Sequence, residues 1–106
     1  MNYNTRFVLN KFGIYSCYIG HHYLIDVITE IKLQDNNFNR INISNIYRKI
    51  ATHHDTCVSN IEYNVRLMIN RSINKYTQAW CKEFDLCYEY IFDMTTKDLI
   101  ILLCSL

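Results

Sequence analysis

The sequence predicts an all-α fold, a single domain of five to six helices that spans residues 1–106 and contains a helix-turn-helix. The chain has no proline and only two glycines, so it offers few turn formers for β-hairpins. Apolar residues recur at spacings of three and four along several segments, which is the period of one helix face. Half of the residues are hydrophobic, and 106 residues can bury one core without metal or disulfide support.

The first predicted helix is capped by Asn4 or Thr5 and runs to Phe12. Gly13 follows, and glycine readily adopts the left-handed conformation that stops a helix. The inward side of this helix is predicted to carry Phe7, Val8 and Phe12.

A second helix is predicted from His21 to Leu33, opened by Gly20. One side of it carries the apolar residues Leu24, Val27, Ile28 and Ile31. Asp26 and Glu30 fall near its outer side, where we expect them to be solvated.

The stretch from Ser44 to Asn70 is predicted to form two helices joined by a tight polar turn at 53–56, whose side chains are suited to capping a helix start. The first helix has an apolar stripe and a small residue, Ala51, that lets another helix pack close. The apolar residues of the pair are Ile46, Ile50, Val58, Ile61, Val65 and Met68. This arrangement is typical of a helix-turn-helix, although two ordinary helices of an all-helical domain would show the same periodicity.

In a helix-turn-helix, the outward face of the second helix enters the DNA major groove. The register of the second helix predicts which residues that face carries: Ser59, Asn60, Glu62, Tyr63, Arg66 and Asn70.

The remaining segments are predicted as follows. Residues 34–42 form a loop with a turn of helix around Phe38, and a break is expected near Ser72. Asn74 then caps a helix over 75–84. The residues of that helix available for packing are Tyr76, Ala79, Trp80 and Phe84.

Residues 85–93 form an aromatic-rich connector whose structure the pattern leaves open. Thr95 and Thr96 are suited to cap a last helix over 97–104, with Asp98 placed favourably in its first turn.

The net charge is +1, which is a weak basic footprint for a nucleic-acid-binding domain. No N-terminal segment has the pattern of a secretory signal. The apolar tail Leu99 to Leu103 is far shorter than the roughly 20 residues that span a bilayer. We therefore expect a cytoplasmic protein without a membrane partner.

The cysteines do not form a CxxC pair and are interpreted as reduced, buried thiols. They are Cys17, Cys57, Cys81, Cys87 and Cys104. His53, His54 and Cys57 are close in sequence, but no second pair of ligands stands at a suitable spacing, so no metal and no other cofactor is expected. The chain shows no nucleophile–base pair, paired-carboxylate site or glycine-rich phosphate loop, and we expect no enzyme activity.

Several short motifs recur in one order along the chain. They are Gly13-Ile14-Tyr15, the run from Tyr18 to Leu24, Ile46-Tyr47, Ile50-Ala51, the run from Asp55 to Glu62, and the run from Thr95 to Ile100. In this order the chain resembles the C-terminal DNA-binding effector domain of the sporulation master response regulator of spore-forming bacteria, the stage zero sporulation protein A family. Residues 34–42 and 72–93 align poorly with it. The resemblance implies a helical domain that binds DNA through its helix-turn-helix.

The chain departs from this family at positions that bear on DNA binding. The family carries arginines where this chain has Asn60 and Tyr63, whereas Glu62 and Arg66 match the family. The lysine pair that closes the family's first helix is Thr52-His53 here. We expect a target sequence different from the family's, and a stand-alone effector without the phosphate-accepting receiver domain.

Two functions follow. The first is a sequence-specific DNA-binding transcription regulator with double-stranded DNA as its partner. The residues expected to face base edges are Ser59, Asn60, Glu62, Tyr63 and Asn64. The residues expected to contact phosphates are Arg48, Lys49, Arg66 and Arg71.

The alternative function is a protein-interaction module that kept the scaffold and lost the DNA surface. It would act as an antagonist or dimerisation partner of a related regulator, or as a homodimer, through aromatic residues such as Tyr88, Tyr90 and Phe92. The simpler interpretation of these three aromatics is a satellite cluster of the core.

Overall fold

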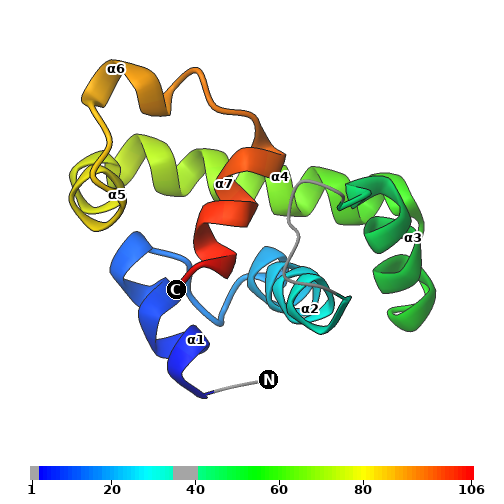
Figure 1. Ribbon diagram of the computed structural model, residues 1–106. Helices are drawn as coiled ribbons and strands as arrows, with labels where there is room; N and C mark the ends of the chain where they lie inside the picture. Colours follow the sequence, from blue (N-terminus) through cyan, green and yellow to red (C-terminus); the bar gives the residue numbers. More distant parts are fainter. Residues whose placement is uncertain (1–2, 35–40) are drawn as a thin grey trace.

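The computed structural model describes residues 3–34 and 41–106, and these residues form seven α-helices and one 3-10 helix with no strand (Figure 1). In chain order they are α1 (Tyr3–Leu9), η1 (Asn10–Phe12), α2 (Ile19–Gln34), α3 (Ile43–His53), α4 (Val58–Lys75), α5 (Thr77–Phe84), α6 (Tyr88–Ile91) and α7 (Thr96–Cys104). The all-α prediction is confirmed. Six helical segments match the predicted ones, and α6 lies in the stretch that the sequence left open. The turn of helix expected around Phe38 lies outside the described residues.

The N-terminal helix ends at Gly13, as predicted. Gly13 has a left-handed φ of 71°, and its N–H donates to the Asn10 carbonyl at 3.1 Å. Phe12 is buried, but Phe7 is 61% exposed, so the prediction that Phe7 points inward is wrong. Leu9 takes the inward position instead, because it lies three residues before Phe12. Phe7 lies two residues before Leu9, which is about 200° around a helix.

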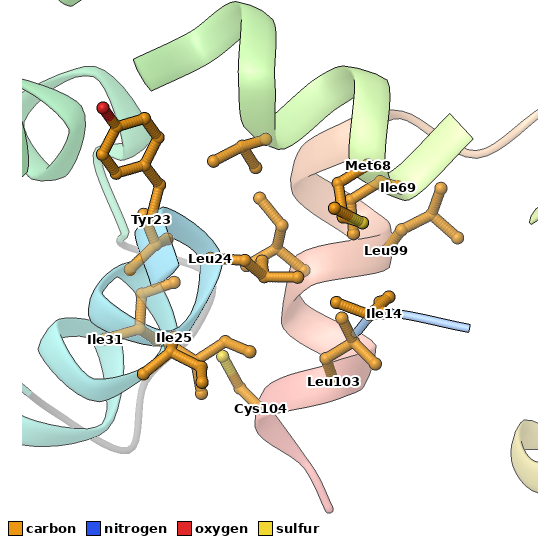
Figure 2. Close-up of a cluster of buried hydrophobic side chains, with 14 of the residues drawn as sticks. Ile14, Tyr23, Leu24, Ile25, Ile31, Met68, Ile69, Leu99, Leu103 and Cys104 are labelled. Atoms are coloured by element: carbon orange, nitrogen blue, oxygen red, sulfur yellow. The ribbon is translucent and has the colours of Figure 1, made fainter. Parts of the chain in front are cut away.

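The core forms where α2, α4 and α7 meet (Figure 1). Figure 2 shows the side chains that converge there, which include Leu24 and Ile25 of α2, Met68 and Ile69 of α4, and Leu99 and Leu103 of α7. The Cα radius of gyration is 13.0 Å, as expected for one globule of this length.

The helices α2 and α4 approach closely at Gly20. A Cβ added to Gly20 would lie 2.8 Å from the Asn64 carbonyl oxygen and 3.1 Å from the Met68 Cβ. Both distances are shorter than comfortable van der Waals contact. Only glycine at this position lets the second turn of α4 rest on the start of α2.

The predicted break near Ser72 is wrong, because α4 continues to Lys75. Ser72 is buried, its hydroxyl donates to the Phe12 carbonyl, and it accepts the Trp80 indole N–H at 2.7 Å. These bonds satisfy a serine in the interior of a helix and tie α4 to η1 and α5. Asn74 is exposed and caps nothing, since α5 begins after Tyr76.

Trp80 is the largest fully buried side chain, and its ring centroid lies 4.9 Å from that of Phe12. Phe84 lies 5.6 Å from Trp80 and is partly buried against the core. The predicted packing role of these residues of α5 is confirmed.

The last helix begins as predicted with a capping box. Thr95 Oγ1 accepts the Asp98 N–H at 3.1 Å, and the Asp98 carboxylate accepts the Thr95 N–H at 3.3 Å. This pair satisfies two of the N–H groups that a helix start leaves open.

All five cysteines are free thiols, but the prediction that they are buried holds only for Cys104. Cys17, Cys57 and Cys87 are exposed because each lies in a connection between helices, and Cys81 is half-buried on α5. Within the described residues, no helix combines the length and apolar character needed to cross a bilayer.

Candidate nucleic-acid interface

A tight turn at residues 54–57 joins α3 to α4. Asp55 adopts a left-handed φ of 53°, a conformation that aspartate reaches more readily than most residues and that removes the need for a glycine. The Thr56 N–H donates to the Ala51 carbonyl at 2.9 Å, and Ala51 is buried. The chain therefore passes from one helix to the next within four residues, the length of turn typical of a helix-turn-helix.

The cap of the second helix differs from the prediction, and the first helix has a cap that was not predicted. Asn42 caps α3, since its Oδ1 accepts the Asn45 N–H at 3.2 Å. The N-cap of α4 is Cys57, which makes no side-chain capping bond. Thr56 precedes the cap position, and its Oγ1 accepts instead from the Asn60 amide at 3.0 Å.

The turn is braced against α2. His54 Nε2 lies 2.5 Å from Asp26 Oδ2, and the His54 ring packs edge-on against Tyr23 with centroids 5.0 Å apart. The Tyr23 hydroxyl in turn accepts from the Asn60 amide at 3.3 Å. These contacts join α2, the turn and the first turn of α4 into one polar network.

The acidic side of α2 is therefore not simply solvated, which corrects the prediction. Besides the Asp26 contact, the Glu30 carboxylate accepts from Lys49 Nζ at 2.6 Å. The hydrogen bond from Lys49 lowers the pKa of the Glu30 carboxyl. Both carboxylates are partly buried because α3 packs over them.

The buried side of α4 is as predicted, with Ile61, Val65 and Met68 in the core and Val58 partly buried against it. The opposite side is exposed and carries Ser59, Glu62, Tyr63, Arg66 and Asn70. Arg66 Nη1 and Glu62 Oε1 are 3.5 Å apart, and both side chains are about half exposed. On the α3 side, burial raises the pKa of Tyr47 to about 12, so this phenol stays neutral beside the pair.

Asn60 was expected on the outward face, but it lies half-buried on the side of α4 that faces α2. Its amide nitrogen donates to Thr56 and Tyr23, and its Oδ1 accepts from the Asn64 amide at 2.9 Å. The Asn64 amide also donates to the Asn60 carbonyl at 2.8 Å. The two asparagines are four residues apart, so they share one side of the helix and hold each other there.

Residues 5–97 match the family model described as the C-terminal domain of sporulation initiation factor Spo0A. The chain belongs to this family. The matched range contains the whole helix-turn-helix and ends in the first turn of α7. The chain matches no curated protein and no solved structure. The Spo0A C-terminal domain is a DNA-binding regulatory domain and not an enzyme family, which supports a DNA-binding effector class for the chain.

The four cations proposed from the sequence do not gather in one place on this Spo0A-family scaffold. Arg66 lies on the outward face of α4, whereas Lys49 is bonded to Glu30 of α2. Arg48 is exposed on α3 and donates to Asn45 at 2.6 Å. Arg71 is exposed on the far half of α4, beside residues of the connector between η1 and α2.

That connector supplies residues that the sequence did not indicate. The Tyr15 hydroxyl lies 2.9 Å from the Tyr76 hydroxyl, although 61 residues separate them. The only sequence signal was the position of Tyr15 inside a family-like motif. No group of three or more His, Cys, Asp or Glu side chains that could hold a metal ion occurs in the part of the chain that the structure describes.

Proposed function

We propose that the protein is a transcription regulator that binds duplex DNA by inserting the outward face of α4 into the major groove. The observation that supports this most is the exposed row of Ser59, Glu62, Tyr63, Arg66 and Asn70 on a helix whose other side is core. The turn before this helix is braced to α2, so the helix is presented rigidly. Family membership points to the same activity.

The residues of this row have suitable chemistry for base readout. Ser59 can donate to or accept from a base edge, and the Glu62 carboxylate can accept the amino group of cytosine. The Tyr63 ring, 55% exposed, offers an apolar surface for a thymine methyl group. Arg66 is assigned to a phosphate or a guanine, and contact with DNA would draw it from Glu62, a pairing worth little at this exposure.

Asn60 and Asn64 are not assigned to base readout, unlike Ser59. Their amides are engaged with each other and with the turn, so we assign them to positioning the start of α4. Arg48 and Arg71 are assigned to phosphates. Lys49 would have to leave Glu30 to join them, which makes it the weakest member of the phosphate set.

The test is binding to a pool of random-sequence duplexes at low salt, followed by sequencing of the retained DNA. We expect retention of duplex by the wild type and a loss of affinity in Arg66→Gln. If Arg66 contacts phosphate, this variant should also flatten the dependence of log affinity on log salt by about one unit. Arg6→Gln, an exposed arginine of α1, is the matched control and should bind as the wild type does. Absence of any binding by the wild type would contradict the proposal.

A second candidate, the protein-interaction module, is favoured by one observation. Tyr88, Tyr90 and Phe92 are 62%, 54% and 46% exposed, so the satellite-core interpretation of these residues is wrong. Tyr88 and Phe92 lie edge-to-face with centroids 5.3 Å apart. If the wild type binds no duplex, this aromatic surface becomes the leading candidate, and sedimentation of the wild type against Tyr88→Ser would test self-association.

A further inference from the structure

A small hollow lies beside the second half of α4, between that helix and the connector that leads into α2. Its volume is about 70 Å³. The residues that line it are Gly13, Tyr15, Tyr18, Met68, Arg71, Ser72, Lys75 and Tyr76. A single water needs about 10–15 Å³ of such volume, so the hollow has room for a compact group of a few heavy atoms such as phosphate.

The lining of the hollow is cationic. Arg71 and Lys75 are both exposed, one helical turn apart on α4, and neither belongs to a salt bridge among the described residues. None of the lining residues carries a carboxylate. Two unneutralised cations without an acid beside them favour an anion.

The two tyrosine hydroxyls add a hydrogen-bond donor. Tyr15 and Tyr76 share one hydrogen bond at 2.9 Å, and this bond raises the pKa of Tyr15. Two hydroxyls hold two protons, and their mutual bond uses one of them. The second proton is free to donate to an oxygen atom seated in the hollow.

The position of Arg71 on α4 separates the hollow from the base-reading face. At 100° per residue, Arg71 lies about 80° around the helix from Tyr63, on the side toward α2. At 1.5 Å per residue, it lies about 13 Å along the axis from the midpoint of Ser59 and Arg66. In a helix-turn-helix the N-terminal residues of the recognition helix contact base edges, so Arg71, in the second half of α4, is placed for a backbone phosphate rather than a base.

We propose that this hollow seats a phosphate group, and that in the DNA complex its occupant is a backbone phosphodiester at the edge of the groove that α4 enters. That the phosphate belongs to DNA rests on the proposed function. That the hollow binds a phosphate group rests only on its lining residues. Arg71 and Lys75 supply the charge, and the Tyr15–Tyr76 pair supplies a neutral donor that fixes the register of the helix along the backbone. The seat carries no base preference of its own.

The test uses the full chain, fluorescence anisotropy with a labelled duplex from the retained pool, and a salt series. We expect Arg71→Gln to reduce the salt slope by about one unit and to weaken binding to all duplexes alike. We expect Tyr15→Phe combined with Tyr76→Phe to weaken binding by about tenfold to a hundredfold, as the loss of a donor to a charged group does, with base preference unchanged. Far-ultraviolet circular dichroism checks that both variants remain folded.

A second arm separates the two sources of phosphate. Inorganic phosphate replaces chloride at constant ionic strength, and amide resonances of Tyr15 and Arg71 are followed by nuclear magnetic resonance without DNA. Saturable shifts that vanish in Arg71→Gln indicate that the hollow binds free phosphate. This conclusion would hold even if the wild type bound no duplex. Shifts that appear only with duplex indicate the backbone as the occupant.

The proposal is overturned if the wild type binds duplex, Arg66→Gln weakens that binding, and the Arg71 and tyrosine variants match the wild type in affinity and slope. It is overturned equally if neither duplex nor inorganic phosphate perturbs the hollow. In the first case the proposed function survives without this seat. In the second case, the proposed function is removed as well if the wild type also fails to bind duplex.

Discussion

At the scale of single residues, several positions are fixed by partners distant in the sequence. Ser72 is the clearest case, since its hydroxyl joins the Phe12 carbonyl, 60 residues away, to the Trp80 indole. A serine in the middle of a helix suggests a break when only neighbouring residues are considered. The structure instead uses it as a buried junction between three elements.

We predict that Ser72→Ala lowers the free energy of unfolding by about 1–3 kcal/mol, because the Trp80 N–H would remain buried without an acceptor. Urea denaturation followed by circular dichroism measures the change. Asn74→Ala, an exposed substitution two residues on, should change the stability by no more than about 0.5 kcal/mol. Equal stabilities of the Ser72 variant and the wild type would show that water replaces the hydroxyl.

Tyr47 gives a prediction for alkaline pH. Burial raises its pKa to about 12 in the folded protein, against 10.0 for an ordinary tyrosine. Between these values the unfolded chain releases the phenolic proton while the folded chain retains it, so the stability contributed by the protonated phenol is lost as pH rises from 10 toward 12. The urea midpoint should fall from pH 9 to pH 11, and this fall should be smaller in Tyr47→Phe than in the wild type. Tyr90→Phe, at an exposed position, is the control and should behave as the wild type.

At the scale of elements, the sequence predicted the helices whose burial follows one strong period. The predicted stripes of α2 (Leu24, Val27, Ile28 and Ile31) and of α4 (Ile61, Val65 and Met68) are buried because they follow period 3.6. Tyr23 and Ile25 of α2 are also buried, and the stripe did not indicate them. The short α6 could not be predicted, since four residues carry no period and neighbouring helices hold the segment. Phe7 was misplaced because it lies about 200° around the helix from Leu9, the residue that shares a side with Phe12.

The candidate site also contains residues that the sequence placed correctly and residues that it could not place. Ser59, Glu62, Tyr63 and Arg66 are exposed as the register of α4 implies. Asn60 could not be placed from that register, because its position depends on how α2 crosses α4. The hollow beside Arg71 was not predictable either, since it needs residues from two segments, 13–18 and 68–76, that are distant in the sequence.

Asn60 therefore yields a prediction about α4 as an element. We expect Asn60→Ala to weaken binding to all duplexes by a similar factor, because it removes bonds to Thr56, Tyr23 and Asn64 that hold the start of the helix. The selected base preference should stay the same. Selection from a random pool with the wild type and the variant measures both quantities. A relaxed preference at one base position would instead indicate that the amide reads a base edge and leaves its internal partners on binding.

At the scale of the whole molecule, one core extends through the helices without covalent staples. The five thiols are free, and the only buried one, Cys104, has its pKa raised to about 11 by burial. A thiol held in this way is inert, while Cys57, whose pKa is lowered by its hydrogen bond with Ser59, is open to solvent.

We predict that a reducing agent leaves the melting temperature nearly unchanged, because no disulfide contributes to the fold. Differential scanning calorimetry with and without reductant measures this. Cys104→Ser should lower the melting temperature, since it places a hydroxyl in an apolar environment, whereas Cys87→Ser at an exposed position should not. A fall of many degrees on reduction would show that cysteines cross-link the chain in solution.

The close approach of α2 and α4 at Gly20 has a consequence for how a duplex would be accommodated. With the Asn64 carbonyl resting on the glycine and the turn tied to α2, α4 has little freedom to tilt relative to the rest of the molecule. Packed interiors resist such adjustment. In the proposed complex the DNA, rather than α4, would have to change shape. The energy needed to bend it depends on the base steps between the contacts. Sites with flexible pyrimidine–purine steps beside the α4 contacts should be bound more tightly than stiff A-tracts with the same contacted bases.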